Sequence, residues 1–173
     1  MNDLKEKLDE IIDDYLNGER YEDKYNKIRE EIMDVTKKAL EKDPENLEIL
    51  ELKADTLQEL GYYGYAHDTY MEILKIKPRN DRIRLKNADA YLGMRWFGEA
   101  EEVYDRIINK KRKSEYRDEA LIAKLMLNLR VMDKNGYDKT MKKCKKIISE
   151  EDDTEFLESE IKDIEKYFYD DVF

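Results

Sequence analysis

The amino-acid sequence predicts an all-α fold for this 173-residue chain. It contains two prolines and six glycines, whereas glutamate, lysine, leucine and isoleucine are abundant, which is typical of a mostly helical protein. Small and apolar residues recur at helical spacing, for example at Leu50, Ala54, Leu57 and Leu60. A similar pattern returns 34 residues later in the chain. Together these observations indicate antiparallel helix pairs that repeat along the sequence.

Composition predicts one soluble domain that spans residues 1–173, with a highly charged surface. Charged residues make up 44% of the chain, and the mean hydropathy is −0.94. No run approaches the roughly 18 consecutive apolar residues that cross a membrane, and the first residues lack the features of a signal peptide. Cys144 is the sole cysteine, so no intrachain disulfide can form. We therefore expect a reducing compartment, the cytoplasm.

The repeat is defined by positions that align at an offset of 34 residues. Small residues such as Ala54 and Ala66 suit a close crossing of two helices, and Tyr70 is large enough to fill the space beside it. The first copy consists of Leu50, Ala54, Leu57, Ala66, Tyr70 and Ile73, and the second of Arg84, Ala88, Tyr91, Ala100, Tyr104 and Ile107. Each copy therefore predicts two helices joined by a short turn, at residues 61–64 and 95–98.

This pattern resembles the tetratricopeptide repeat. Ala54, Leu57, Ala66, Tyr70 and Pro78 stand where that family has a small residue, a leucine or aromatic, an alanine, an aromatic and a proline. The resemblance implies a right-handed superhelical solenoid of antiparallel helix pairs. It divides the chain into repeats at about 5–46, 47–80, 81–114 and 121–151, followed by a C-terminal capping helix at about 153–169.

Two places carry the chemistry of a helix start. Asp43 precedes Pro44, and proline at the first helical position loses no needed hydrogen bond. Asp153 can cap the last helix, in which apolar residues such as Leu157 and Ile161 follow helical spacing. We expect helices to begin at both places.

The resemblance also implies a concave groove that binds a segment of a partner protein. The candidate partner-binding residues are Glu48, Glu51, Asp55, Gln58, Arg82, Lys86, Asp89, Leu125 and Leu129. This groove would be acidic at one end and apolar at the other, which suits a segment with Lys or Arg followed by hydrophobic residues, or an amphipathic helix. In the alternative interpretation, the acids are merely solvated and the apolar residues pack under the capping helix.

Some members of the family clamp the carboxylate tail of a chaperone, but the sequence argues against that ligand. Asp9, Asp13 and Leu52 stand at three of the five clamp places, and only Arg82 and Lys86 keep basic character. Carboxylates at those places would repel a ligand carboxylate.

We expect no catalysis, cofactor or metal. The only histidine, His67, has no partner nucleophile in a recognisable motif, and Cys144 replaces a core residue, which predicts a buried, inert thiol. The function predicted from the sequence is therefore that of a non-catalytic protein–protein interaction scaffold.

Two other functions stay open. The aromatic tail at 167–173 and the edge of the solenoid would suit a self-assembling structural subunit. The fourth repeat is rich in lysine and would suit nucleic acid, with basic residues at 110–113 and at Lys139, Lys142, Lys143, Lys145 and Lys146. The net charge of −10 opposes nucleic-acid binding, and neutralisation by the acidic helix after Glu150 is the favoured interpretation.

Overall fold

The expected all-α fold is confirmed by a computed structural model, which describes residues 1–17, 22–169 and 172 and shows no strand among them. The tail residues Asp170, Asp171 and Phe173 lie outside this part. The chain divides into two compact units, Met1–Trp96 and Phe97–Phe173. This boundary falls inside the predicted third repeat, 81–114. The single-domain solenoid therefore stays a prediction.

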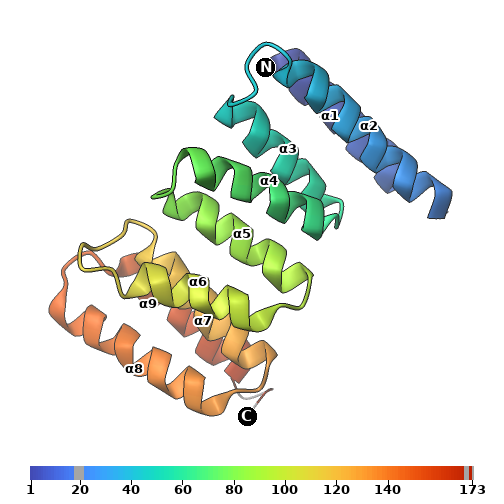
Figure 1. Cartoon of the computed structure of the whole chain (residues 1–173). Helices are drawn as coiled ribbons and strands as arrows, with labels where there is room; N and C mark the ends of the chain where they lie inside the picture. The colour runs from blue at the N-terminus through green and yellow to red at the C-terminus, as the bar shows by residue number, and fades with distance from the viewer. Residues whose placement is uncertain (18–21, 170–171, 173) are drawn as a thin grey trace. The chain divides into compact units, whose positions relative to one another are not determined.

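Unit 1 is a series of helices that pack on their neighbours in sequence (Figure 1). Its helices are α1 (Asn2–Asn17), α2 (Glu22–Leu40), α3 (Leu47–Glu59), α4 (Tyr63–Ile76) and α5 (Asp81–Gly93). Helices α1 and α2 pair with each other, and both also contact α3. Helix α4 contacts both α3 and α5, so the predicted repeat at 47–80 is a helix pair.

Unit 2 contains α6 (Phe97–Ile108), α7 (Arg117–Arg130), α8 (Lys134–Glu150) and α9 (Glu155–Ile164). Helix α7 contacts α6, α8 and α9. The predicted capping helix at 153–169 consists of α9 and a wider π-helical turn at Glu165–Tyr169. The predicted start of the fourth repeat, residue 121, lies inside α7, which begins at Arg117.

The same backbone motif ends α3, α5 and α7. A residue with positive φ follows each helix: Gly61 at 82°, Arg95 at 62° and Met132 at 57°. The next backbone N–H bonds five residues back, from Tyr62 to Leu57, Trp96 to Tyr91 and Asp133 to Asn128, each at 2.8 Å. This pattern satisfies carbonyls that a helix end would leave unpaired. Gly61 and Arg95 are 34 residues apart, and Arg95 and Met132 are 37 residues apart. The turn after α7 therefore departs from the 34-residue spacing by three residues.

The helix starts differ from the prediction. Helix α3 begins three residues after Pro44, where the Asn46 side chain accepts a hydrogen bond from the Ile49 N–H at 3.2 Å. Asn80 caps α5 in the same way, through the Ile83 N–H at 3.2 Å. Asparagine is among the strongest N-cap residues, so Asn46 fixes the start and leaves Pro44 in the preceding turn. Thr154, rather than Asp153, is the residue before α9.

Most residues of the predicted packing pattern are buried, whereas Arg84 and Tyr91 of the second copy are half-buried. Ala54, Ala66 and Tyr70 in unit 1 have no exposed surface, and neither has Tyr104 in unit 2. The prediction that Cys144 is buried is confirmed, and burial raises the pKa of its thiol to about 11. The apolar pattern of the sequence therefore identified much of the core correctly.

The turn motif makes a prediction about stability. Replacing Arg95 with glycine should raise the free energy of unfolding by about 0.5–1 kcal/mol, because a left-handed backbone strains any residue with a Cβ. Urea unfolding of the purified chain measures this change. Arg95→Ala is the matched control, since it removes the same side chain and keeps the Cβ. Equal stability of the two variants would show that the backbone conformation at residue 95 is not the cause.

Candidate partner-binding site

Seven of the predicted partner-binding residues lie in unit 1, in two rows. The row on α3 has spacings of three, four and three residues, and the row on α5 has spacings of four and three. Residues at such spacing share one helix face. The α3 row consists of Glu48, Glu51, Asp55 and Gln58, and the α5 row of Arg82, Lys86 and Asp89.

Ion pairs connect the two rows. Arg82 Nη2 lies 2.5 Å from Glu51 Oε2. Lys86 Nζ bridges the α3 row, at 2.7 Å from Glu51 Oε1 and 2.6 Å from Asp55 Oδ2. From α4, the buried Tyr70 hydroxyl donates a hydrogen bond to Asp55 Oδ1 at 2.7 Å. We call these five residues the α3–α5 network.

The pKa shifts of Glu51 and Lys86 favour the charged forms of both side chains. Burial alone would raise the pKa of Glu51, but hydrogen bonds from Lys86 and Arg82 hold it below its usual value. Burial would likewise lower the pKa of Lys86, but Asp55 and Glu51 raise it. Burial and the hydrogen bond to Asp55 raise the pKa of Tyr70, so it stays a neutral donor.

The network changes the electrostatic prediction for this end of the groove. The carboxylates of Glu51 and Asp55 are compensated by cations from α5, so this surface is less acidic than the α3 residues alone suggest. Sequence reasoning named the residues on both helices but not their pairing, because pairing depends on how α3 and α5 face each other.

Three polar groups of the rows remain outside the network. Glu48 is exposed and has no ion-pair partner among the described residues. The Gln58 Oε1 atom is buried and accepts no hydrogen bond there. Asp89 reaches solvent, yet the surrounding protein removes enough hydration to raise its pKa to about 6. Glu48 and Asp89 reach solvent, so a ligand can contact them without breaking an existing pair, whereas the chain itself covers the Gln58 Oε1 atom.

A cavity of about 350 Å³ lies beside the α3 row. It is formed between the start of α1 and the first turns of α3, and its lining contains charged, polar and apolar residues. The lining residues are Met1, Asn2, Lys5, Glu48, Glu51, Leu52 and Asp55. The three carboxylates belong to the predicted partner-binding set, whereas the contribution of α1 was not predicted.

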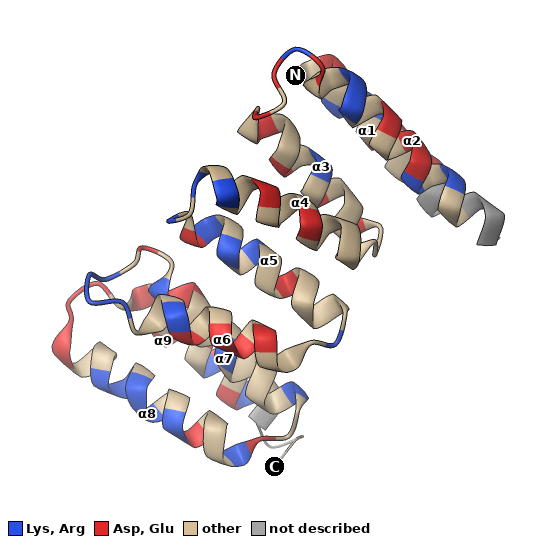
Figure 2. Ribbon diagram, in the orientation of Figure 1, with Lys and Arg blue, Asp and Glu red and all other residues tan. Residues whose placement is uncertain are grey.

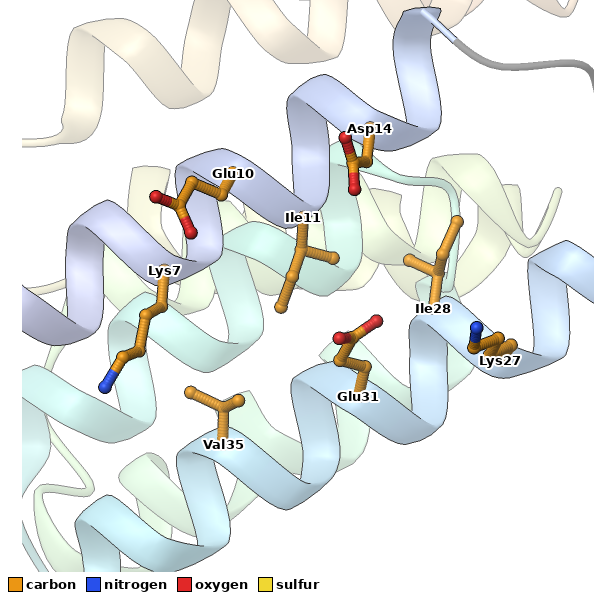
Figure 3. Close-up of a pocket in the computed structure, with 8 residues that line it drawn as sticks. All are labelled: Lys7, Glu10, Ile11, Asp14, Lys27, Ile28, Glu31 and Val35. Atoms are coloured by element: carbon orange, nitrogen blue, oxygen red, sulfur yellow. The ribbon is translucent and has the colours of Figure 1, made fainter.

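A second cavity, of about 340 Å³, lies between α1 and α2 (Figure 3). Its apolar residues are Ile11, Ile28 and Val35, and the charged residues around them are Lys7, Glu10, Asp14, Lys27 and Glu31. The predicted set contained none of these residues. The apolar members follow helical spacing, but spacing alone does not distinguish a groove from a packed core.

The apolar end of the predicted site is corrected by the structure. Leu125 is 0% exposed and Leu129 is 5% exposed, so both belong to the core of unit 2. The physical reason is that α7 is covered by neighbouring helices, including α9. The alternative interpretation, in which apolar residues of this helix pack under the capping helix, agrees better with their burial.

The basic residues of α8 and of the loop between α6 and α7, residues 109–116, are only partly neutralised. Lys145 pairs with Glu165 at 3.1 Å, and Lys113 pairs with Glu151 at 2.5 Å. Glu151 also accepts two hydrogen bonds from Arg117. These contacts and Lys113 hold its pKa at about 2. The expected neutralisation by the acidic end of the chain therefore reaches some of these lysines.

His67 has a local structural role. Its Nδ1 lies 2.8 Å from the Asn87 Oδ1, and its ring lies 4.8 Å from the Tyr91 ring. Across the part of the chain that the structure describes, no three metal-ligating side chains come together. None of the described helices has the length and apolar character of a membrane span.

Comparison with known proteins gives no identification. No model of a known protein family matches the chain, and no similar sequence is found among curated proteins. The resemblance to the tetratricopeptide repeat therefore depends on the residue pattern.

The α3–α5 network should contribute measurably to stability. Replacing Lys86 with methionine should lower the free energy of unfolding by about 1 kcal/mol, because Glu51 and Asp55 each lose a cation while solvent screens the remainder. Urea unfolding measures the loss. Lys75→Met is the control, because it makes the same chemical change at an exposed position of α4. If Lys75→Met lowers the free energy of unfolding by the same amount, the α3–α5 network is not the cause of the loss.

Asp89 should make stability depend on pH. Its folded-state pKa of about 6 lies above the usual 3.8, so the folded chain is penalised where the carboxylate is charged. Asp89→Asn should therefore raise the melting temperature at pH 7.5. This advantage should shrink as the pH falls from 6 to 4 and vanish below about 4, where both states of the wild type are protonated.

Differential scanning calorimetry of the wild type and Asp89→Asn over this pH range makes the comparison. An advantage of equal size at pH 7.5 and pH 3.5 would mean that the Asp89 carboxylate is not desolvated in the folded chain.

Proposed function

We propose that this chain is a non-catalytic scaffold, a right-handed superhelical solenoid of the tetratricopeptide type that binds a segment of a partner protein. The repeated turns after α3, α5 and α7 support a repeat architecture, as do the asparagine caps of α3 and α5. The cytoplasm remains the proposed location, in keeping with the single buried cysteine.

The observation that carries the proposed function is the cavity beside α3. Glu48 lies at this cavity as an exposed carboxylate with no ion pair among the described residues. Leu52 offers an apolar surface in the same lining. A lysine or arginine side chain fits this combination, because its aliphatic stem packs on apolar atoms while its charged end reaches a carboxylate.

Asp89 also favours a ligand that carries positive charge. Its carboxylate reaches solvent but is partly desolvated, so a nearby cation stabilises its charged form. Asp89 belongs to the α5 row, beside the network. A partner segment with basic residues would pair with Glu48 and Asp89 and leave the pairs of Lys86 in place.

Self-assembly is the second candidate function, and exposed aromatic side chains favour it. Tyr167 and Phe168, in the π-helical turn, are 54% and 44% exposed. Exposed aromatic residues are suited to a contact with another copy. Sedimentation at increasing protein concentration distinguishes this function, because a scaffold for other proteins needs no self-association.

Peptide selection tests the proposed binding function. Twelve-residue peptides displayed on phage are selected on the purified chain, and we expect the bound peptides to be enriched in lysine or arginine. Glu48→Lys should weaken binding of the selected peptides about tenfold, because it replaces an attracting charge by a repelling one. Glu45→Lys is the matched control, because Glu45 is exposed and precedes α3.

Fluorescence anisotropy of the best labelled peptide gives the dissociation constants. Equal weakening by Glu48→Lys and Glu45→Lys would indicate a response to net charge. Selection of acidic peptides would contradict the proposed site.

A further inference from the structure

Two basic segments of unit 2 that are distant in sequence lie together. Lys143 Nζ on α8 donates a hydrogen bond to Asn109 Oδ1 at 2.6 Å, just after α6. Asn109 begins the loop that connects α6 to α7, residues 109–116. Further along this loop, Lys113 contacts Glu151, which directly follows α8. The loop is therefore held along the second half of α8, and its exposed Lys111 and Arg112 add to the lysines of that helix.

Helix α8 carries a row of exposed lysines, and Figure 2 shows basic residues along its length. Lys139, Lys142 and Lys146 are spaced by three and four residues, so they share one helix face. Lys139 and Lys142 have no carboxylate partner among the described residues. Lys146 has a contact of 3.8 Å with Glu150 of its own helix. We call Lys111, Arg112, Lys139, Lys142 and Lys146 the α8 basic surface.

Lys143 lies beneath this surface in a partly buried position. Burial lowers the pKa of Lys143, Asp105 opposes this shift, and Lys124 and Arg117 add to it. The adjacent carboxylate of Glu151 is already engaged by Lys113 and Arg117. The acids that follow α8 therefore leave Lys139 and Lys142 uncompensated.

Elsewhere in this chain, a lysine facing a neighbouring helix bridges two carboxylates that are four residues apart. In unit 2, Lys124 of α7 lies 3.0 Å from Glu101 Oε1 and 2.7 Å from Asp105 Oδ2 on α6. In unit 1, Lys86 of α5 makes the same bridge to α3. Residues four apart lie on one helix face, so one ammonium group reaches both carboxylates.

We propose that the α8 basic surface docks an acidic helix of another protein. Lys139 and Lys142 would each bridge two carboxylates of that helix that are four residues apart. The positive charge of the surface complements such a helix, and the fold already uses this bridge twice. The surface lies in unit 2, so the proposal is independent of the site on α3 and α5.

Nucleic acid fits this surface less well than an acidic helix. The net charge of −10 repels any anionic partner at long range, and it repels a polyphosphate more, because duplex DNA carries one charge per about 1.7 Å whereas glutamates four residues apart lie about 6 Å apart along a helix. Stacking of unpaired bases needs exposed rings, and the aromatic residue of α8, Tyr137, is 2% exposed. An acidic helix needs only the lysine spacing that α8 presents.

The probe for this site is a fluorescein-labelled, alanine-based helical peptide with glutamates at four-residue spacing. Its control has the same composition, with the glutamates moved off a common helix face. At 50 mM NaCl we expect anisotropy to show binding of the first peptide, and 300 mM NaCl to weaken it about tenfold, as screening requires. Equal binding of the two peptides overturns the proposed spacing.

Charge reversal locates the binding surface. Lys139→Glu with Lys142→Glu should weaken the peptide at least about tenfold, while the same two positions changed to arginine should retain binding. Lys37→Glu with Lys42→Glu is the control, because these exposed lysines of unit 1 give the same change of net charge. Equal weakening in the control overturns the proposal, and circular dichroism establishes that each variant is folded.

Two further results would overturn the assigned partner. Tighter binding of a twelve-nucleotide oligothymidylate than of the peptide would assign the surface to nucleic acid. The second result is a dimer that the chain forms without any added partner and that Lys139→Glu with Lys142→Glu converts to a monomer. That result would assign the surface to a second copy of this chain.

Discussion

The bridge from Lys86 to Glu51 and Asp55 is the interaction on which the site in unit 1 depends. It joins α5 to α3 across α4, and Tyr70 from α4 completes it. Two partly buried carboxylates this close would repel each other without a cation between them. By compensating them, Lys86 determines which charges of the two rows remain for a ligand.

The groups that remain give the site its character. Glu48 keeps an uncompensated charge at the cavity, and Asp89 keeps a carboxylate with incomplete hydration. Both favour a cationic ligand, whereas the compensated network supplies a fixed frame beside them. The α8 basic surface of unit 2 instead carries uncompensated positive charge, because Lys139 and Lys142 have no carboxylate partners like those of Lys86 among the described residues. The proposed partners of the two surfaces therefore differ in charge.

Periodic features of the sequence predicted much of the fold. Buried positions such as Ala54 and Tyr70 repeat every 34 residues, and repetition distinguishes packing from chance. Features fixed by local competition were harder to predict. Asn46, rather than Asp43 and Pro44, starts α3 because its side chain reaches a backbone N–H. The asparagines before α3 and α5 lie 34 residues apart, so the repeat held a signal for both caps.

The site was predicted as a set of positions, without its interactions. Lys86 lies on a different helix from Asp55, and sequence does not show which side chains meet. Leu125 has the residue type of a binding surface, but it is covered by its own unit. Burial by neighbouring helices is a tertiary effect, and residue type does not distinguish it from burial by a partner.

Carbon-detected NMR of the side-chain carboxyl groups tests the central claim most directly. The isotopically labelled chain is titrated with a peptide that contains lysine, and the carboxyl resonances of Glu48, Asp55 and Asp89 are followed. The proposed site predicts that Glu48 and Asp89 shift with the same dissociation constant, while Asp55 stays nearly unchanged because Lys86 already holds it. Unchanged Glu48 and Asp89 resonances at saturation would contradict recognition of a cationic segment by this face of unit 1.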